Sequence, residues 1–389
     1  MSSKMYYDLF MQYSRRFVEI LRQRIQGNSP LIQVVLGPRQ VGKTTGVKQL
    51  ISQYTGKSHY AHADDLLAPD RSWVLEQWQK ALSLGNGTLL IIDEIQKVPN
   101  WSEVVKKLWD DEPNRIKLIV LGSSSLLLQK GLSESLAGRF ELLRVLQWSF
   151  TESKEAFNYD LNQFLKYGGY PGAVPFESDY DRWYSYIKDS IVESAISKDI
   201  IQDNRVGNPA LFRQAFEILC SYPSQEISYT KLLGQLQNKG NSDLVKHYIQ
   251  LYCGAFLLTG LQKYSHKAYL SRSSSPKILL GCPALISMYR QPRDTDKELF
   301  GRLLEQTVGN RLISLPGEVY FWRDRSHELD FVFKYHGEIY AIEVKSGRMK
   351  PMGGLSRFCS EFPESKSIVI TKENFEIFDH DPIRFLQEI

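Results

Sequence analysis

A glycine-containing loop constrains this chain more than any other part of its 389 residues. Residues 37–45 read GPRQVGKTT and directly follow an apolar, β-branched run over residues 31–36. The run predicts a buried parallel strand, and residues 45–52 are expected to form a helix. A strand, this loop and a helix in that order are the context that a phosphate-binding loop requires. A chance glycine turn is the alternative, and both flanking elements argue against it.

The loop also predicts how ATP would be held. Gly37 and Gly42 allow backbone N–H groups to curl around the β-phosphate, and the helix N-terminus adds positive potential. Lys43 is expected to reach the β- and γ-phosphates, and the Thr44 hydroxyl to ligate Mg²⁺. The other loop residues expected to contact ATP are Pro38, Arg39, Gln40, Val41 and Thr45.

Two acidic residues end a second apolar run, over residues 88–94. Asp93 is expected to hold the magnesium through water, and Glu94 to polarise the attacking water as a general base. An acid pair at the end of a strand can instead cap the next helix. Because Asp93 follows Lys43 by 50 residues, the pair favours ATP hydrolysis.

Three further residues are candidates for sensing or completing the nucleotide site. A third predicted strand, residues 116–121, ends in GSSS, where Ser123 or Ser124 would lie beside the γ-phosphate. The same serines could cap a helix over residues 126–130. Arg139 ends the stretch SLAGR before a strand over residues 141–146. In ring-forming ATPases an arginine near this point reaches the neighbour's nucleotide, which predicts a catalytic finger in a homo-oligomer; an exposed salt bridge is the alternative.

Bulk properties exclude other classes. No apolar stretch approaches the ~18 residues of a membrane span, and the polar N-terminus lacks the apolar segment of a signal peptide. The four cysteines form no CxxC pair, which is typical of a reducing compartment. We therefore expect a cytoplasmic protein. The net charge of +4 permits nucleic-acid binding without requiring it.

Four segments together carry a family resemblance: GPRQVGKTT, LLIIDEIQKVPNW, LGSSSLLLQKGLSESLAGRF and YGGYPGAV, the last over residues 167–174. In this order and spacing they resemble prokaryotic AAA+ ATPases near the STAND signalling branch that carry a C-terminal nuclease-like domain. The resemblance covers nearly the whole chain. It implies a P-loop ATPase core over residues 1–150, a helical lid over 151–205, a winged helix over 206–270 and a nuclease-like domain over 271–389.

The pattern between residues 211 and 264 independently predicts a winged helix. It reads helix, short strand (226–228), two helices (229–237 and 243–253), then a strand pair (256–259 and 261–265). The second of the two paired helices would be the recognition helix. Basic side chains expected to face DNA are Lys239, Lys246 and His247 on or before this helix, and Lys263 and Lys267 on the wing. Use of a winged helix for protein packing is the alternative.

The C-terminal segment carries opposed carboxylates on a predicted hairpin. If strands 328–334 and 338–345 pair so that Lys334 faces Ile339, Asp330 faces Glu343, about 5 Å away on the same side of the sheet. Lys345 shares that side because it lies two residues further along. We expect Asp330 and Glu343 to bind Mg²⁺ or Mn²⁺ and Lys345 to orient water, with Glu305 on a helix over 301–311 as a further ligand.

This arrangement resembles the PD-(D/E)XK restriction-endonuclease fold, which implies metal-dependent phosphodiester cleavage, although the motif's preceding proline is absent. A solvated sheet face with a cross-strand salt bridge is the alternative.

The sequence thus predicts an α/β chain: an AAA+ P-loop parallel sheet, a helical lid, a winged helix and a restriction-endonuclease-like domain. The leading functional hypothesis is an ATPase that controls DNA binding and cleavage. A nucleotide switch whose C-terminal domain binds DNA or a protein partner without cutting is the runner-up, and an assembly protein closed by ATP is the third hypothesis.

Overall fold

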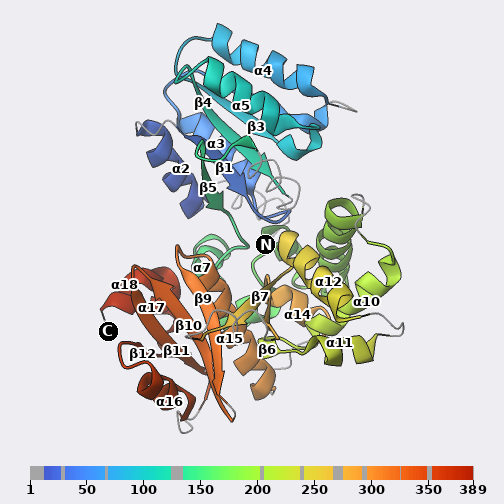
Figure 1. Cartoon of the computed structure of the whole chain (residues 1–389), viewed down its shortest axis with the longest axis vertical. Coiled ribbons are helices and arrows are strands. Elements are labelled where there is room, and N and C mark those ends of the chain that lie inside the picture. Colours follow the sequence, from blue (N-terminus) through green and yellow to red (C-terminus); the bar gives the residue numbers. More distant parts are fainter. Residues whose placement is uncertain are drawn as a thin grey trace. The chain divides into compact units, whose positions relative to one another are not determined.

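The computed structural model describes residues 13–27, 31–65, 69–123, 135–201, 206–236, 241–265, 275–290, 296–324, 326–347 and 353–388. The chain divides into two compact units, Met1–Leu146 and Gln147–Ile389, and each contains its own sheet (Figure 1). We describe each unit separately.

The N-terminal unit is built on five parallel strands in the order β2-β3-β4-β1-β5. The strands are β1 (Ile32–Leu36), β2 (Ser58–His62), β3 (Thr88–Asp93), β4 (Ile116–Gly122) and β5 (Phe140–Arg144). Every residue of β1 and β3 is buried, as expected for central strands covered on both faces. Because the strands are parallel, the segments after β1, β3 and β4 meet at one edge of the sheet.

Helices flank this sheet. They are α2 (Arg16–Gln26), α3 (Lys43–Gln53), α4 (Arg71–Ser83) and α5 (Trp101–Asp111), with short 3₁₀ turns η1 (Ala63–Asp65) and η2 (Ile95–Lys97). Gly46 lets α3 approach α2, since a Cβ there would lie 2.3 Å from the Phe17 ring. The α4 helix begins where the Asp70 carboxylate accepts hydrogen bonds from the amides of Ser72 and Trp73.

The C-terminal unit begins with helices. They are α7 (Phe150–Phe157), α8 (Leu161–Tyr167), η3 (Pro171–Phe176), α9 (Tyr180–Ser185), the π-helices η4 (Tyr186–Glu193) and η5 (Ala195–Ile200), α10 (Pro209–Cys220), α11 (Tyr229–Gln235) and α12 (Ser242–Gly254). Ser149 and Asp160 form capping boxes with Glu152 and Gln163, and these fix the starts of α7 and α8.

A seven-stranded sheet runs through the rest of this unit in the order β12-β11-β10-β9-β7-β8-β6. The strands are β6 (Gln225–Glu226), β7 (Leu258–Lys263), β8 (Lys277–Leu280), β9 (Glu318–Asp324), β10 (His327–Tyr335), β11 (Glu338–Lys345) and β12 (Lys366–Thr371). Parallel pairing of β7 with β9 joins the two halves, so the segments predicted as winged helix and nuclease-like domain share one sheet.

The remaining helices of this unit are α14 (Pro283–Ser287), α15 (Lys297–Ile313), α16 (Gly353–Glu361), α17 (Phe375–His380) and α18 (Pro382–Gln387). A core cluster that includes Trp322, Leu329, Val332 and Phe358 packs α16 against β9 and β10. Among the described residues, none of the helices has the length and apolar character needed to cross a membrane.

The predicted hairpin and its register are confirmed. Lys334 pairs with Ile339 and Phe331 with Ile342, and Asp330 and Glu343 are the next residues on the two strands beyond this last pair. The predicted strand pair over residues 256–259 and 261–265 is wrong. Gly260 does not turn the chain there; it stays inside β7 and pairs with Ile278 of β8.

Candidate functional site

The loop after β1 has the backbone geometry of a phosphate cradle. A Cβ at Gly37 would lie 1.8 Å from the Val145 carbonyl oxygen, so a side chain has no room there. Gly42 has a φ of 87° and Gln40 a φ of 62°, and the curled backbone leads into the first turn of α3. The N–H groups of this loop and helix start can therefore converge on an anion.

Basic side chains hold the loop from both sides. The Lys43 ammonium, which is buried, donates to the carbonyl oxygens of Gly37 at 2.7 Å and Pro38 at 2.6 Å. Arg15, which the sequence analysis did not single out, donates to the carbonyl oxygens of Val41 at 3.0 Å and Leu146 at 3.1 Å. Arg15 thereby ties the loop to the segment that follows β5.

Thr44 and Asp93 lie side by side at the edge of the sheet. The Thr44 hydroxyl donates to Asp93 Oδ2 at 2.7 Å, and the Tyr60 hydroxyl donates to the same oxygen at 2.9 Å. A hydroxyl and a buried carboxylate are hard oxygen ligands of the kind that Mg²⁺ prefers. The residues present therefore fit the magnesium ion that a P-loop ATPase uses.

Glu94 belongs to a small polar network. Gln96 Nε2 donates to Glu94 Oε2, and the Ser123 hydroxyl donates to the same oxygen at 3.3 Å. The structure thus brings the predicted base and one predicted sensor together. Ser124 lies outside the described residues. The sequence did not predict the contact of Gln96 with Glu94. The only hint was that Gln96 lies two residues after Glu94 in the chain.

Arg139 lies at the opposite end of the sheet's strands. The Arg139 carbonyl oxygen accepts a hydrogen bond from the amide of Ile32, the first residue of β1. The phosphate loop, in contrast, follows the last residue of β1. Its guanidinium makes two hydrogen bonds to Asp110, at 2.8 and 3.0 Å. This is the salt bridge that the sequence left open as the alternative to a finger.

The four polar residues predicted for the C-terminal site occupy neighbouring elements. Asp330 (β10) and Glu343 (β11) directly follow the last residue pair of the ladder, Phe331 with Ile342, and Asp330 Oδ2 accepts a hydrogen bond from the Val344 amide at 2.7 Å. Lys345 forms an ion pair with Glu343 Oε1. Glu305 on α15 is buried, although Arg302 Nη1 lies 3.4 Å from its Oε2.

Lys277 joins this cluster and was not predicted. Its side chain on β8 is fully buried, and its ammonium nitrogen lies 2.6 Å from Glu305 Oε1, 3.7 Å from Glu328 Oε1 and 3.8 Å from Asp330 Oδ1. Glu305, Glu328, Asp330 and Glu343 together form what we call the carboxylate cluster. The only feature of the sequence that could have indicated a buried lysine here is that Lys277 begins the apolar run KILL.

Burial governs the electrostatics of the cluster. Desolvation raises the pKa of Glu305 to about 7, even though the neighbouring Lys277 ammonium acts to lower it. Desolvation and the nearby Asp330 carboxylate also raise the pKa of Glu343. Within the described ranges, no group of three or more His, Cys, Asp or Glu residues is arranged to hold a metal ion. Because the Lys277 ammonium already lies beside Glu305, Glu328 and Asp330, the cluster as it stands does not fit the predicted Mg²⁺ or Mn²⁺.

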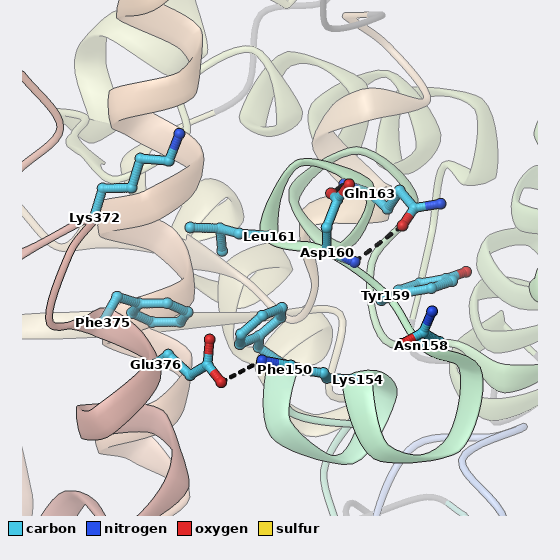
Figure 2. A pocket seen from close by; sticks show the side chains of 10 residues that line it. All are labelled: Phe150, Lys154, Asn158, Tyr159, Asp160, Leu161, Gln163, Lys372, Phe375 and Glu376. Carbon is cyan, nitrogen blue, oxygen red and sulfur yellow. Dashed lines mark hydrogen bonds and ion pairs between the residues drawn. The ribbon is translucent and has the colours of Figure 1, made fainter.

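A separate cavity of about 480 Å³ lies between α7, α8 and α17 (Figure 2). Figure 2 shows Phe150 and Phe375 side by side, and their ring centroids lie 5.7 Å apart. Lys154 and Glu376 form an ion pair at its rim. The mixture of apolar and charged side chains that line the cavity does not indicate a particular ligand or reaction.

Comparisons with known proteins agree with the N-terminal geometry. Residues 29–154 match the family model described as an AAA domain, whereas residues 158–292 and 300–386 match two domains of unknown function, DUF8612 and DUF4143. Among solved structures, the Walker-type ATPase PABY2304 of Pyrococcus abyssi aligns over 72% of this chain and 99% of its own, with a TM-score of 0.50 and 15% identity. This likeness concerns the fold alone.

Relatives in sequence are uncharacterized. A Methanocaldococcus jannaschii protein is 27% identical over 61% of this chain but only 57% of its own length. A Mycobacterium tuberculosis protein is 27% identical over 86% of this chain and 74% of its own. The family match and the loop geometry both support an AAA-type P-loop domain over residues 29–154.

Proposed function

We propose that the chain binds ATP with Mg²⁺ at Gly37–Thr45 and hydrolyses it. One observation carries the proposal: the Thr44 hydroxyl and the Asp93 carboxylate share a hydrogen bond beside Glu94, directly after a phosphate-binding loop. Nucleotide would displace Lys43 from the loop carbonyls that it now contacts, which frees the ammonium for phosphate oxygens.

Each residue of the site then has a separate task. Thr44 and Asp93 would hold the magnesium, which supplies positive charge to the phosphate oxygens when bound. Glu94 would accept the proton of the attacking water. Gln96 and Ser123 donate to one oxygen of Glu94 and so fix the direction of the carboxylate.

The direct test is ATP binding by the full chain, with Lys43→Ala as the variant and Lys57→Ala as a matched surface control. We expect Lys43→Ala to abolish measurable binding, because it removes a charge-assisted contact to each of two phosphates. Binding of equal affinity by Lys43→Ala and the control would refute the assigned ATP site.

We further propose that the C-terminal unit binds DNA without cutting it. The order α10, β6, α11, α12, β7, β8 is that of a winged helix, and β8 lies between β6 and β7 in the sheet. On α12, Lys246 and His247 are exposed, as a recognition helix requires. Lys239 and Lys267 lie outside the described residues.

The cleavage hypothesis has weaker support in this geometry. Lys345 pairs with Glu343, but the Lys277 ammonium lies 2.6 Å from Glu305 and 3.8 Å from Asp330, where a metal ion would need the same carboxylates. No cleavage step follows from such an arrangement.

DNA binding is tested by the ATPase rate with and without DNA, together with direct DNA binding. Lys246→Glu is expected to weaken DNA binding at least tenfold, since it reverses one charge on the proposed recognition helix. Lys188→Glu, an exposed lysine of the same unit, is the matched control. Equal DNA binding by both variants would remove α12 from the interface.

A further inference from the structure

The fully buried lysine of β8 makes the most unusual charge arrangement among the described residues. Lys277 contacts carboxylates from two elements, Glu305 on α15 and both Glu328 and Asp330 on β10. The same ammonium donates to the Asp330 carbonyl oxygen at 3.2 Å and lies 5.0 Å from the Phe331 ring centroid. Each of these groups presents a negative charge, a carbonyl oxygen or an aromatic ring to the ammonium.

Burial makes the lysine and the acids depend on each other. An ammonium group removed from water is tolerated only where opposite charge and hydrogen bonds replace its hydration. Buried carboxylates have the same need for a cation. Glu305 and Glu343 are both more than nine-tenths buried, so neither can rely on solvent.

Glu343 contributes to the cluster a carboxylate oxygen that could bind a cation. Lys345 pairs with Oε1 of Glu343, whereas Oε2 of Glu343 is buried and has no hydrogen-bond partner among the described residues. A buried carboxylate oxygen without a partner is costly, and a cation is the group that would satisfy it best. The cluster thus gathers carboxylates around an ammonium group.

We propose that Lys277 is the resident cation of the carboxylate cluster and takes the place of a divalent metal ion. A divalent ion could enter only against repulsion from this fixed positive charge and only by displacing its contacts. The site is then complete without metal, and removal of the lysine would create a divalent-metal site. This inference deepens the proposal of a non-cutting C-terminal unit, and its functional meaning rests on that proposal.

The experiment measures Mn²⁺ binding by calorimetry and by electron paramagnetic resonance on the full, nucleotide-free chain. Wild type is expected to show no Mn²⁺ site that Asp330→Asn removes, whereas Lys277→Ala and Lys277→Met should each gain one. Adding Asp330→Asn to either variant should remove the gained site. Lys334→Met, which deletes a partly exposed lysine of the same hairpin, is the matched control and should gain none.

The wild-type measurement decides the proposal even if the Lys277 variants fail to fold. A Mn²⁺ site in wild type that Asp330→Asn abolishes would overturn the role of Lys277. Folded Lys277 variants that bind no Mn²⁺ would overturn it as well. Variants that melt at lower temperature than wild type and are rescued by Mn²⁺ would support it.

A parallel DNA-cleavage assay separates the two proposals. If wild type binds Mn²⁺ in the cluster but leaves DNA intact, only the role of Lys277 fails. If DNA is cut with Mn²⁺ and cleavage survives Asp330→Asn, the non-cutting proposal fails while Lys277 keeps its assigned role.

Discussion

The hydroxyl of Thr44 donates a 2.7 Å hydrogen bond to the carboxylate of Asp93. The two residues lie 49 positions apart in sequence, one at the start of α3 and the other at the end of β3. Their contact joins the phosphate loop to the acidic end of a neighbouring strand. It places the two expected magnesium ligands within hydrogen-bond distance of each other, next to the residue expected to act as base.

The network around Glu94 gives a prediction on turnover. Gln96→Ala removes a donor to Glu94 Oε2 and is expected to lower kcat about tenfold, equivalent to ~1.4 kcal/mol, with ATP affinity unchanged. Steady-state phosphate release and nucleotide titration measure the two quantities. Gln53→Ala, at the exposed end of α3, is the control. A change in ATP affinity alone would assign Gln96 to binding.

Arg139 gives a prediction that separates its two interpretations. Because the guanidinium is paired with Asp110 on its own chain, Arg139→Ala should leave ATP turnover close to wild type. Asp110→Asn should have a similarly small effect. A loss of turnover in Arg139→Ala alone, with a rate that rises with protein concentration in wild type, would restore the finger in a homo-oligomer.

Asp379 should stabilise the C-terminal unit through three elements. Its Oδ2 accepts the amide and the hydroxyl of Thr151 on α7, each at 2.7 Å, and Arg311 of α15 lies 3.5 Å from Oδ1. We expect Asp379→Ala to cost about 3 kcal/mol in the free energy of unfolding, because it leaves Arg311 without its carboxylate. Asp379→Asn keeps an acceptor and should cost less. Denaturant unfolding measures the free-energy differences, and hydrogen exchange of the Thr151 amide reports on the local contact. Equal stability of wild type and both variants would contradict this role of Asp379.

Glu177 predicts a pH dependence of stability. Desolvation raises its pKa to about 8 from an ordinary value of 4.5, so the folded state keeps this proton longer than the unfolded state. The contribution to stability is therefore present below about pH 4.5 and is lost as the pH rises through 8.

The matched variant for this pH effect is Glu177→Gln, which cannot ionise. Its melting temperature relative to wild type should increase across this pH window. A difference that is independent of pH would mean that Glu177 titrates normally.

Local patterns explain why the nucleotide site was predictable. Lys43 and Thr44 sit in a contiguous motif, and Asp93 and Glu94 end a strand whose apolar character is plain in the sequence. The register that pairs Lys334 with Ile339 followed from a short hairpin turn, because a tight turn fixes the pairing of both strands.

Contacts between distant segments were not predictable in this way. Lys277 meets Glu305 and Asp330 only because β8 joins the sheet beside β7 and α15 packs against it. No spacing rule relates these positions. The predicted break between residues 259 and 261 failed for a related reason: an isolated glycine favours a turn locally, but pairing with Ile278 of β8 keeps Gly260 within an extended strand.

The most direct test of the account is ATP turnover by Glu94→Gln, measured beside ATP binding. Glutamine can keep polar contacts to Gln96 and Ser123 but cannot accept the proton of water. We predict ATP affinity close to wild type and turnover reduced by about a hundredfold or more. Turnover by Glu94→Gln equal to that of wild type would contradict the assignment of Glu94 as the general base.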